Sequence, residues 1–400
     1  MSPKALLARV LERDRGRLLA ALIARVGDFQ RAEDALQEAA VSALVHWGRA
    51  GVPASPAGWL LRAALRKAID GYRRDATLAR HRATLAVLAA EEAADPDPQT
   101  IPDDRLRLIF TCCHPALEEK TRIALTLRSL CGLTTPQVAA VFLDAEPTMG
   151  QRLSRARAKI AAARIPFAIP GPEDLPARLH SVLTTVYLIF TAGYAQGPDA
   201  GIDLCTEAIF LARLLVQLAP DQPEVEAALA LLLLTHARAA ARTGPEGQTL
   251  PPSQQDRGLW NRGELAEGRQ LLDRAVARRA PGPFQIKAAI AALHTQDNGP
   301  DWPQIAALYA RLYDAEPTPV IALNHAVALA ESGGLAQALA QVEALTPELD
   351  GYQPFHAVRA DLCARSGQTG AARAEYARAI ALAPSPADRS FLQARLGMLG

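Results

Sequence analysis

The sequence has few aromatic residues and few sulfur-containing ones. Only 5% of its 400 residues are aromatic, whereas 50% are hydrophobic, and alanine and leucine predominate among these. A chain of this composition buries its apolar surface by packing helices rather than sheets. It also exceeds the length that one hydrophobic core usually serves. The sequence therefore predicts an all-α protein of two to four domains.

Features of secreted and membrane proteins are also missing. The five cysteines are odd in number and scattered, unlike the dense framework of a small secreted domain. The N-terminus, MSPKALLARVLERDRGRLL, carries charges throughout and has no uninterrupted apolar run of the kind found in signal peptides. The most apolar stretch, AALALLLLTHA from Ala227, has about half the length needed to cross a bilayer and is predicted to be a buried core helix. We expect a cytoplasmic protein without a membrane partner.

Motifs that carry catalysis are missing too. The sequence contains no Gly-rich phosphate loop, nucleophile elbow or metalloprotease helix. Cys112, Cys113 and His114 stand together, but adjacent cysteines lack the two-residue spacing of common zinc sites, and no second pair has it. Core packing is the favoured interpretation of all five cysteines. We predict no enzyme, no metal site and no cofactor, while the net charge of +1 does not decide nucleic-acid binding.

Prolines divide the chain into segments. Asp-Pro steps in ADPDPQTIPDD disfavour helix and indicate a linker, and a series of four prolines from Pro166 marks another boundary. The predicted segments are a first helical unit at 1–75, a linker at 76–104, a second helical unit at 105–165, a helical extension at 166–280 and repeats at 281–400.

Three segments near the C-terminus end alike. The sequences DAEP, ALTP and ALAP end at Pro317, Pro347 and Pro384, which are 30 and 37 residues apart. This spacing lies near the 34-residue period of tetratricopeptide repeats, which pair two helices per repeat. The pattern predicts a tetratricopeptide-like array, with an irregular α-helical bundle as the alternative.

The segment VGDFQRAEDALQEAAVSALVHW has the periodicity of an amphipathic helix. Asp34 and Glu38 lie one turn apart on its exposed face, where like charges repel mildly and a basic partner surface would stabilise them. An ordinary solvated acidic face is the alternative. The predicted apolar stripe on the other face consists of Ala32, Ala35 or Leu36, Ala39, Ala43 and Trp47.

The next segment, PAGWLLRAALRKAIDGYRRD, combines a helix start at Pro56 with an aromatic and several basic residues. Basic side chains suit phosphates, and Trp59 could meet an unstacked base or belong to the core. The basic residues of this segment are Arg62, Arg66, Lys67, Arg73 and Arg74.

A third segment has the pattern of a helix-turn-helix. Gly132 ends one helix, Thr134 and Gln137 have capping-box spacing, and a turn is expected around Asp144. The first helix is predicted to bury Val138, Ala139 and Phe142, and the second to bury Met149, Leu153, Ala156 and Ile160. The exposed face of the second helix is basic and carries Gln151, Arg152, Arg155 and Lys159. Such a helix fits the DNA major groove, and an amphipathic helix with a cationic surface is the alternative.

These three segments, in this order, resemble the extracytoplasmic-function sigma factors, which are bacterial transcription initiation factors. AEDALQEA is similar to the helix of sigma region 2 that binds the clamp helices of the largest catalytic subunit of RNA polymerase. WLLRAALRKAIDGYRR resembles the helix that captures the melted minus-ten strand, and the helix-turn-helix resembles region 4, which reads the minus-thirty-five element.

The resemblance implies a role for particular residues. It assigns polymerase binding to Asp34, Gln37 and Glu38. It assigns minus-ten DNA binding to Trp59, Arg62, Arg66, Lys67, Arg73 and Arg74. It assigns minus-thirty-five DNA binding to Thr148, Gln151, Arg152, Arg155 and Lys159. Gly150 departs from many relatives, which carry alanine or a polar residue there, and Pro147 fits only in the first turn of the helix.

The remaining motifs extend the resemblance over nearly the whole chain. RLIFTCCHPAL, YLIFTAGY, DLCTEAIFLARLL and the tail resemble a subgroup with a C-terminal tetratricopeptide-like extension. This implies that core polymerase and promoter DNA are partners. Because the extension contains no recognisable second enzyme, we expect it to modulate activity by contacting the sigma regions, polymerase or a regulatory protein at the C-terminal repeats. YLIFTAGY fits a core helix or a docking surface. The alternatives for the whole chain are an operator-binding regulator with a sensing repeat domain and a repeat scaffold protein.

Overall fold

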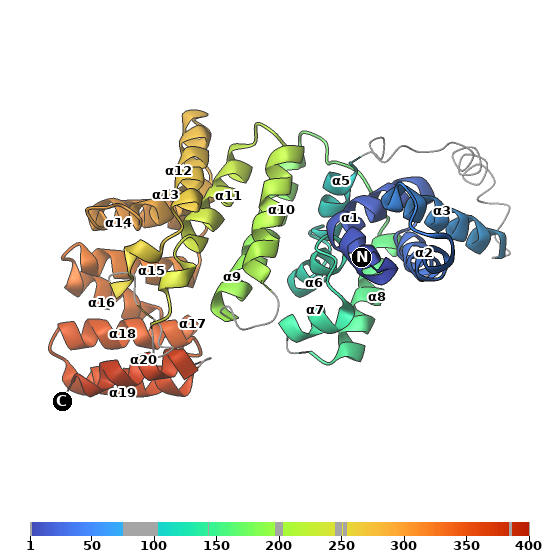
Figure 1. The fold of residues 1–400 in the computed structure, drawn as a ribbon. Coiled ribbons are helices and arrows are strands. Elements are labelled where there is room, and N and C mark those ends of the chain that lie inside the picture. Colours follow the sequence, from blue (N-terminus) through green and yellow to red (C-terminus); the bar gives the residue numbers. More distant parts are fainter. Residues whose placement is uncertain are drawn as a thin grey trace. The chain divides into compact units, whose positions relative to one another are not determined.

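The computed structural model describes residues 2–74, 103–142, 144–196, 203–244, 250, 254–383 and 386–399. Its regular elements over these ranges are helices, without a β-strand, which confirms the predicted all-α class. The chain forms two compact units, Met1–Leu218 and Ala219–Gly400 (Figure 1). The border between them lies inside the segment predicted as a helical extension. Most of the predicted linker at 76–104 lies outside the described residues.

Local signals in the sequence account for the first three helices. Ser2 caps α1 by accepting a hydrogen bond from the Ala5 amide, and Gly27 ends α1 in the left-handed conformation at φ 74°. Asp28 then caps α2 by accepting from the Arg31 amide at 2.8 Å. The three helices pack on one another around a leucine-rich core. Their bounds are α1 Pro3–Val26, α2 Phe29–Ala50 and α3 Pro56–Arg74.

The helix-turn-helix has the predicted capping box. The Thr134 side chain accepts from the Gln137 amide, and the Gln137 side chain accepts from the Thr134 amide at 2.8 Å. Val138 and Ala139 are buried as predicted, whereas Phe142 is only half-buried beneath the Lys120 ammonium. The helices of this part are α5 Arg105–Cys112, α6 Glu119–Ser129, α7 Thr135–Val141 and α8 Glu146–Ala162.

Two further helices, α9 Leu175–Gln196 and α10 Leu204–Leu218, complete the first unit. Polar contacts join α9 to α5 and α6, the latter through Arg122, which donates to the Ser181 hydroxyl. Arg178 donates to the Phe110 carbonyl at 2.7 Å, and Ser181 donates to the Cys113 carbonyl at 2.8 Å. The YLIFTAGY segment lies in α9, with Ile189 and Phe190 buried, which supports the core interpretation. The segment predicted as an extension thus begins as part of the first unit.

The second unit is a succession of helices that pack on their neighbours along the chain (Figure 1). The apolar stretch from Ala227 forms a buried helix, as predicted. No helix in the described part of the chain is long and apolar enough to span a membrane. The α-helices are α11 Pro223–His236, α12 Arg262–Ala277, α13 Pro283–Leu293, α14 Trp302–Ala315, α15 Pro319–Glu331, α16 Leu335–Ala344, α17 Thr346–Leu349, α18 Gln353–Arg365, α19 Thr369–Ala381 and α20 Pro386–Gly397.

The prolines that suggested repeats occupy different structural positions. Pro317 lies in the connection between α14 and α15, whereas Pro347 lies in the first turn of the short helix α17. Pro384 lies outside the described residues. The packing of α14 on α15 and of α18 on α19 is compatible with paired-helix repeats. The tetratricopeptide assignment stays a prediction.

Acid is expected to destabilise the second unit through His294. Burial lowers the pKa of His294 to about 4, and its ring packs edge-on against Trp302 at 5.3 Å. An unfolded histidine titrates near 6.5, so the stabilisation is complete above that pH and is lost as the pH falls toward 4. Between pH 7 and 4.5 we expect wild type to lose about 2–3 kcal/mol more unfolding free energy than His294→Gln. Urea unfolding followed by circular dichroism measures this difference; equal losses would contradict it.

Candidate protein- and nucleic-acid-binding site

One exposed face of α2 carries acidic and polar residues first and large apolar residues further along the helix. Asp34, Gln37 and Glu38 are exposed, and the apolar residues that continue their face are Val41, Leu44 and Val45, which are 63%, 44% and 54% exposed. The opposite face is buried along the predicted stripe, including both Ala35 and Leu36. An exposed row of large apolar side chains beside carboxylates is typical of a protein-binding surface.

Two contacts orient the carboxylates of this face. The Gln30 amide nitrogen donates to both Asp34 oxygens at 2.9 Å. The Lys67 ammonium on α3 lies 3.8 Å from a Glu38 oxygen, and both groups remain open to solvent. Because an exposed hydrogen bond and an exposed ion pair of this length both contribute little, each carboxylate can exchange its contact for a basic partner.

The face of α3 combines an aromatic platform with basic groups. Trp59 is half-buried: its ring stacks on His46 with centroids 5.4 Å apart and meets Trp47 edge-on at 5.6 Å. Arg62 and Lys67 are half-buried, and Arg66 is exposed. Arg73 and Arg74 end the helix, and their side chains lie outside the described part. The platform is compatible with either interpretation of Trp59, a core residue or a base-stacking one.

Helix α8 presents most of its predicted DNA-binding residues to solvent. Thr148, Gln151, Arg155 and Lys159 are exposed, while Met149, Leu153, Ala156 and Ile160 are buried as predicted. Pro147 lies in the first turn of the helix, where no backbone hydrogen bond is lost.

Arg152 behaves differently from the other basic residues of α8. Its side chain is 19% exposed and lies 3.6 Å from Asp144 and 3.8 Å from Glu118. These contacts hold the guanidinium against the turn of the helix-turn-helix. Its predicted role in DNA binding therefore requires it to leave two carboxylates.

Gly150 offers a direct stability test of α8. It lies in the helix interior, and a Cβ at this position would meet no atom within 4 Å. Glycine costs about 1 kcal/mol relative to alanine inside a helix because its unfolded backbone has more freedom. We expect Gly150→Ala to raise the unfolding free energy by about 0.5–1 kcal/mol. Urea denaturation measures this, and a destabilised variant would show that the glycine is required for packing.

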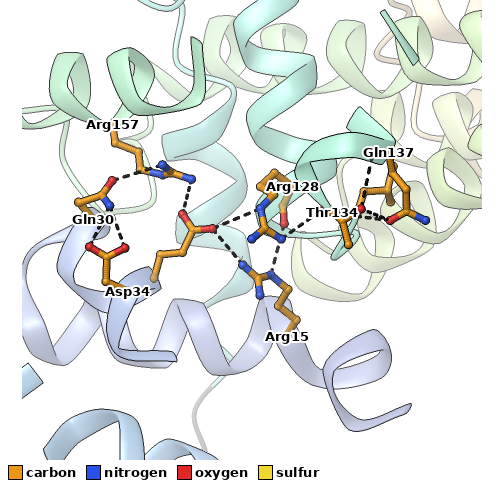
Figure 2. A network of polar contacts seen from close by, with 9 residues as sticks. Arg15, Gln30, Asp34, Arg128, Thr134, Gln137 and Arg157 are labelled. Carbon is orange, nitrogen blue, oxygen red and sulfur yellow. Dashed lines mark hydrogen bonds and ion pairs between the residues drawn. The ribbon is translucent and has the colours of Figure 1, made fainter. Parts of the chain in front are cut away.

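A buried carboxylate on α2 forms a cluster that was not predicted. The side chain of Glu33 is 1% exposed and faces three guanidinium groups. Figure 2 labels the three arginines that carry them, Arg15, Arg128 and Arg157. The Glu33 oxygens lie 3.0 Å from Arg15 on α1, 3.5 Å from Arg128 on α6 and 2.6 Å from Arg157 on α8. We call these four residues the Glu33 cluster. It joins the three-helix bundle to the helix-turn-helix part.

The Glu33 cluster contains three cationic side chains and one anionic side chain, so positive charge is in excess. Burial is the main cause that lowers the pKa of Arg15 to about 10, and the neighbouring Arg128 cation acts in the same direction. Burial also lowers the pKa of Arg128. One signal in the sequence pointed to the cluster: Glu33 is an acidic residue within the buried side of α2. Its partners could not be identified from local patterns, because they lie on three other helices.

The cysteines are all buried, in agreement with the core interpretation. Burial raises the pKa of Cys112 well above its ordinary range, so its thiol stays protonated and unreactive. In the described ranges, no group of three or more histidine, cysteine or acidic side chains is arranged to hold a metal ion.

Comparisons with known proteins match two regions of the first unit to sigma-70 domains. Residues 10–77 match sigma-70 region 2, and residues 107–160 match sigma-70, region 4. Residues 178–276 match a family of unknown function (DUF6596). The chain is also similar to an uncharacterised protein of Rhizobium meliloti (strain 1021), with 41% identity over 396 residues that cover 96% of this chain and 94% of the relative. No solved structure matches the chain.

Proposed function

The chain belongs to the sigma-70 family, whose members direct RNA polymerase to promoters, and we propose that it is a factor of the extracytoplasmic-function type. In this proposal the α2 face binds core polymerase, α3 holds the melted minus-ten strand and α8 reads the minus-thirty-five element. The polymerase supplies all the chemistry, and the protein acts beside it in the cytoplasm. The observation that carries the proposal is the presence of regions 2 and 4 in that order on one chain.

The α2 face supports polymerase docking. Its carboxylates and its exposed apolar residues lie on one side of the helix, so a partner can combine electrostatic attraction with apolar burial. Asp34, Gln37 and Glu38 are the residues that we propose to contact the clamp helices. A surface that only solubilised the helix would not need Val41 and Val45 beside the acids.

The DNA-binding surfaces on α8 and α3 are proposed because their side chains are of types that bind DNA and are at least partly exposed. On α8, Gln151 and Arg155 are exposed near the middle of the helix and can reach base edges or phosphates in the major groove. On α3, the Trp59 ring lies beside basic side chains, a combination that binds single-stranded DNA by stacking and charge.

We further propose that the helices after region 4 modulate initiation. The first of them, α9, is hydrogen-bonded to α5 and α6, so a ligand or regulatory protein that displaces α9 would act directly on region 4. Paired helices of the tetratricopeptide type present surfaces for such proteins.

Selection from random duplex DNA tests the function against its rivals. The full-length protein is incubated with a random pool, with and without core polymerase, and bound DNA is sequenced. We expect enrichment of two separated elements only when core polymerase is present. Enrichment of one operator without polymerase would instead support a helix-turn-helix regulator, and no enrichment in either arm would support a repeat scaffold.

A further inference from the structure

A cavity opens beside the Glu33 cluster, between the start of α2 and the end of α8. Its volume is about 470 Å³, within the range of sites that hold small organic molecules. Part of its wall is apolar and buried, and consists of Phe29 on α2, Ile160 on α8 and Ile165 just after α8. The lining residues are distinct from those that we propose to bind polymerase or DNA. The cavity is therefore a candidate for a separate binding site.

Two arginines bring positive charge to this cavity. Arg157 lies one turn before Ile160 on α8, and Arg164 follows the end of that helix. The acidic residue in the described lining is Asp28, whose carboxylate already accepts a hydrogen bond from the Arg31 amide at 2.8 Å. The charges of the lining therefore favour an anionic ligand over a cationic one.

The Arg157 guanidinium supplies two further reasons for an anion to bind. Its nitrogens lie 2.6 Å from a Glu33 oxygen and 3.3 Å from the Gln30 oxygen, whereas its buried Nε atom has no hydrogen-bond partner in the described part of the chain (Figure 2). Most buried donors in proteins do have an acceptor. Arg157 also belongs to the Glu33 cluster, where three guanidinium groups share one carboxylate. A further negative charge in the cavity would offset this excess.

We propose that the cavity binds a small organic anion, whose carboxylate or phosphate group contacts Arg157 and Arg164 and whose apolar body packs on Phe29, Ile160 and Ile165. The apolar wall favours such a ligand over a simple inorganic ion, because burial of apolar surface adds to the attraction between charges. The ligand contacts α2 and α8 together and so stabilises the folded first unit. This inference goes beyond the proposed function and does not depend on it.

Matched small molecules test the class of ligand. The full-length protein is titrated with 1-naphthoate, 1-naphthyl phosphate, 1-naphthylmethylamine and inorganic phosphate, and binding is followed by ligand-observed NMR without polymerase or DNA. The first three compounds share a ring system and differ in charge, whereas inorganic phosphate has the charge without the rings. Comparison of the carboxylate with the phosphate ester shows which anionic group the site prefers.

We expect at least one of the two aromatic anions to bind with a dissociation constant on the order of 1 mM, as is usual for an unoptimised ligand of this size. The aromatic cation should bind at least about tenfold more weakly, because it meets the arginines with the same sign of charge. Inorganic phosphate should also bind at least about tenfold more weakly, because it buries no apolar surface.

Two variants locate the site in the cavity. Ala161→Trp places a large side chain at the cavity wall, and Arg164→Gln removes one of the two cations. The matched controls are Ala162→Trp, at the next exposed position along the chain, and Arg262→Gln, on an exposed arginine of the second unit. We expect each site variant to weaken binding of the preferred aromatic anion by about tenfold, while the controls stay within about twofold of wild type. Circular dichroism checks that every variant is folded.

The outcomes test the cavity separately from the sigma function. The anion site would be overturned if the aromatic cation bound as tightly as the anions, or if the site variants bound like their controls. Equal affinities for inorganic phosphate and the aromatic anions would overturn the role of the apolar wall. Absence of binding by both aromatic anions at about 10 mM, tenfold above the expected dissociation constant, would overturn the proposal as a whole. None of these results depends on whether the protein recruits polymerase.

Discussion

Reversing the charge of the α2 face is expected to abolish polymerase binding. In Asp34→Arg/Glu38→Arg, two exposed carboxylates become cations on a helix whose core side is unchanged. Their repulsion from a basic partner, together with the two lost attractions, should cost on the order of 3 kcal/mol or more, which is at least about 100-fold in affinity. Fluorescence anisotropy with labelled protein and core polymerase measures the change.

The control for this variant carries the same change in charge elsewhere. Glu173→Arg/Glu348→Arg also replaces two exposed glutamates but leaves α2 intact. We expect its affinity to stay within about threefold of wild type, since distant exposed charges are screened at physiological salt. Equal losses in the two variants would show that net charge, rather than the α2 face, governs binding.

Removing the helices after region 4 is expected to unfold that region. A fragment that ends at residue 165 lacks α9, whose buried residues include Val182, Val186 and Phe190. It also loses the hydrogen bonds to the Phe110 and Cys113 carbonyls. Without α9, the apolar side chains of region 4 that pack against it become exposed to water. If two or three large side chains are exposed, the free energy of unfolding falls by about 3–9 kcal/mol, a large part of the stability of a small domain.

A longer fragment provides the comparison. Residues 1–218 retain α9 and α10 and correspond to the first compact unit. We expect 1–218 to show cooperative thermal unfolding and 1–165 to aggregate or melt without a cooperative transition in its region 4 helices. Cooperative unfolding of both fragments at similar temperatures would show that α9 does not support region 4.

Local patterns in the sequence were sufficient for much of the fold. The buried stripe of α2 and the capping box at Thr134 and Gln137 follow from spacing within one or two helical turns, and both occur as predicted. Pro147 likewise lies in the first turn, where its fixed φ is compatible with helix. Such features depend on neighbours in the sequence and need no knowledge of tertiary contacts.

Some features depend on contacts between residues far apart in the sequence, so local patterns could not predict them. Arg152 has the helical position of a DNA-binding residue but is drawn to Asp144 and Glu118 by packing of the turn. Glu33 adjoins the exposed Asp34 in the sequence but is itself buried and faces arginines on three other helices. The border of the first unit likewise follows α9 and α10 rather than the prolines after residue 165.

Transcription of genomic DNA by purified core polymerase, with and without the full-length protein, tests the central claim most directly. The 5′ ends of the transcripts are sequenced, so that no promoter has to be known beforehand. We predict a set of 5′ ends that requires the protein, shares two upstream elements and disappears with Asp34→Arg/Glu38→Arg. Identical 5′ ends in the presence and absence of the protein would contradict its function as a sigma factor.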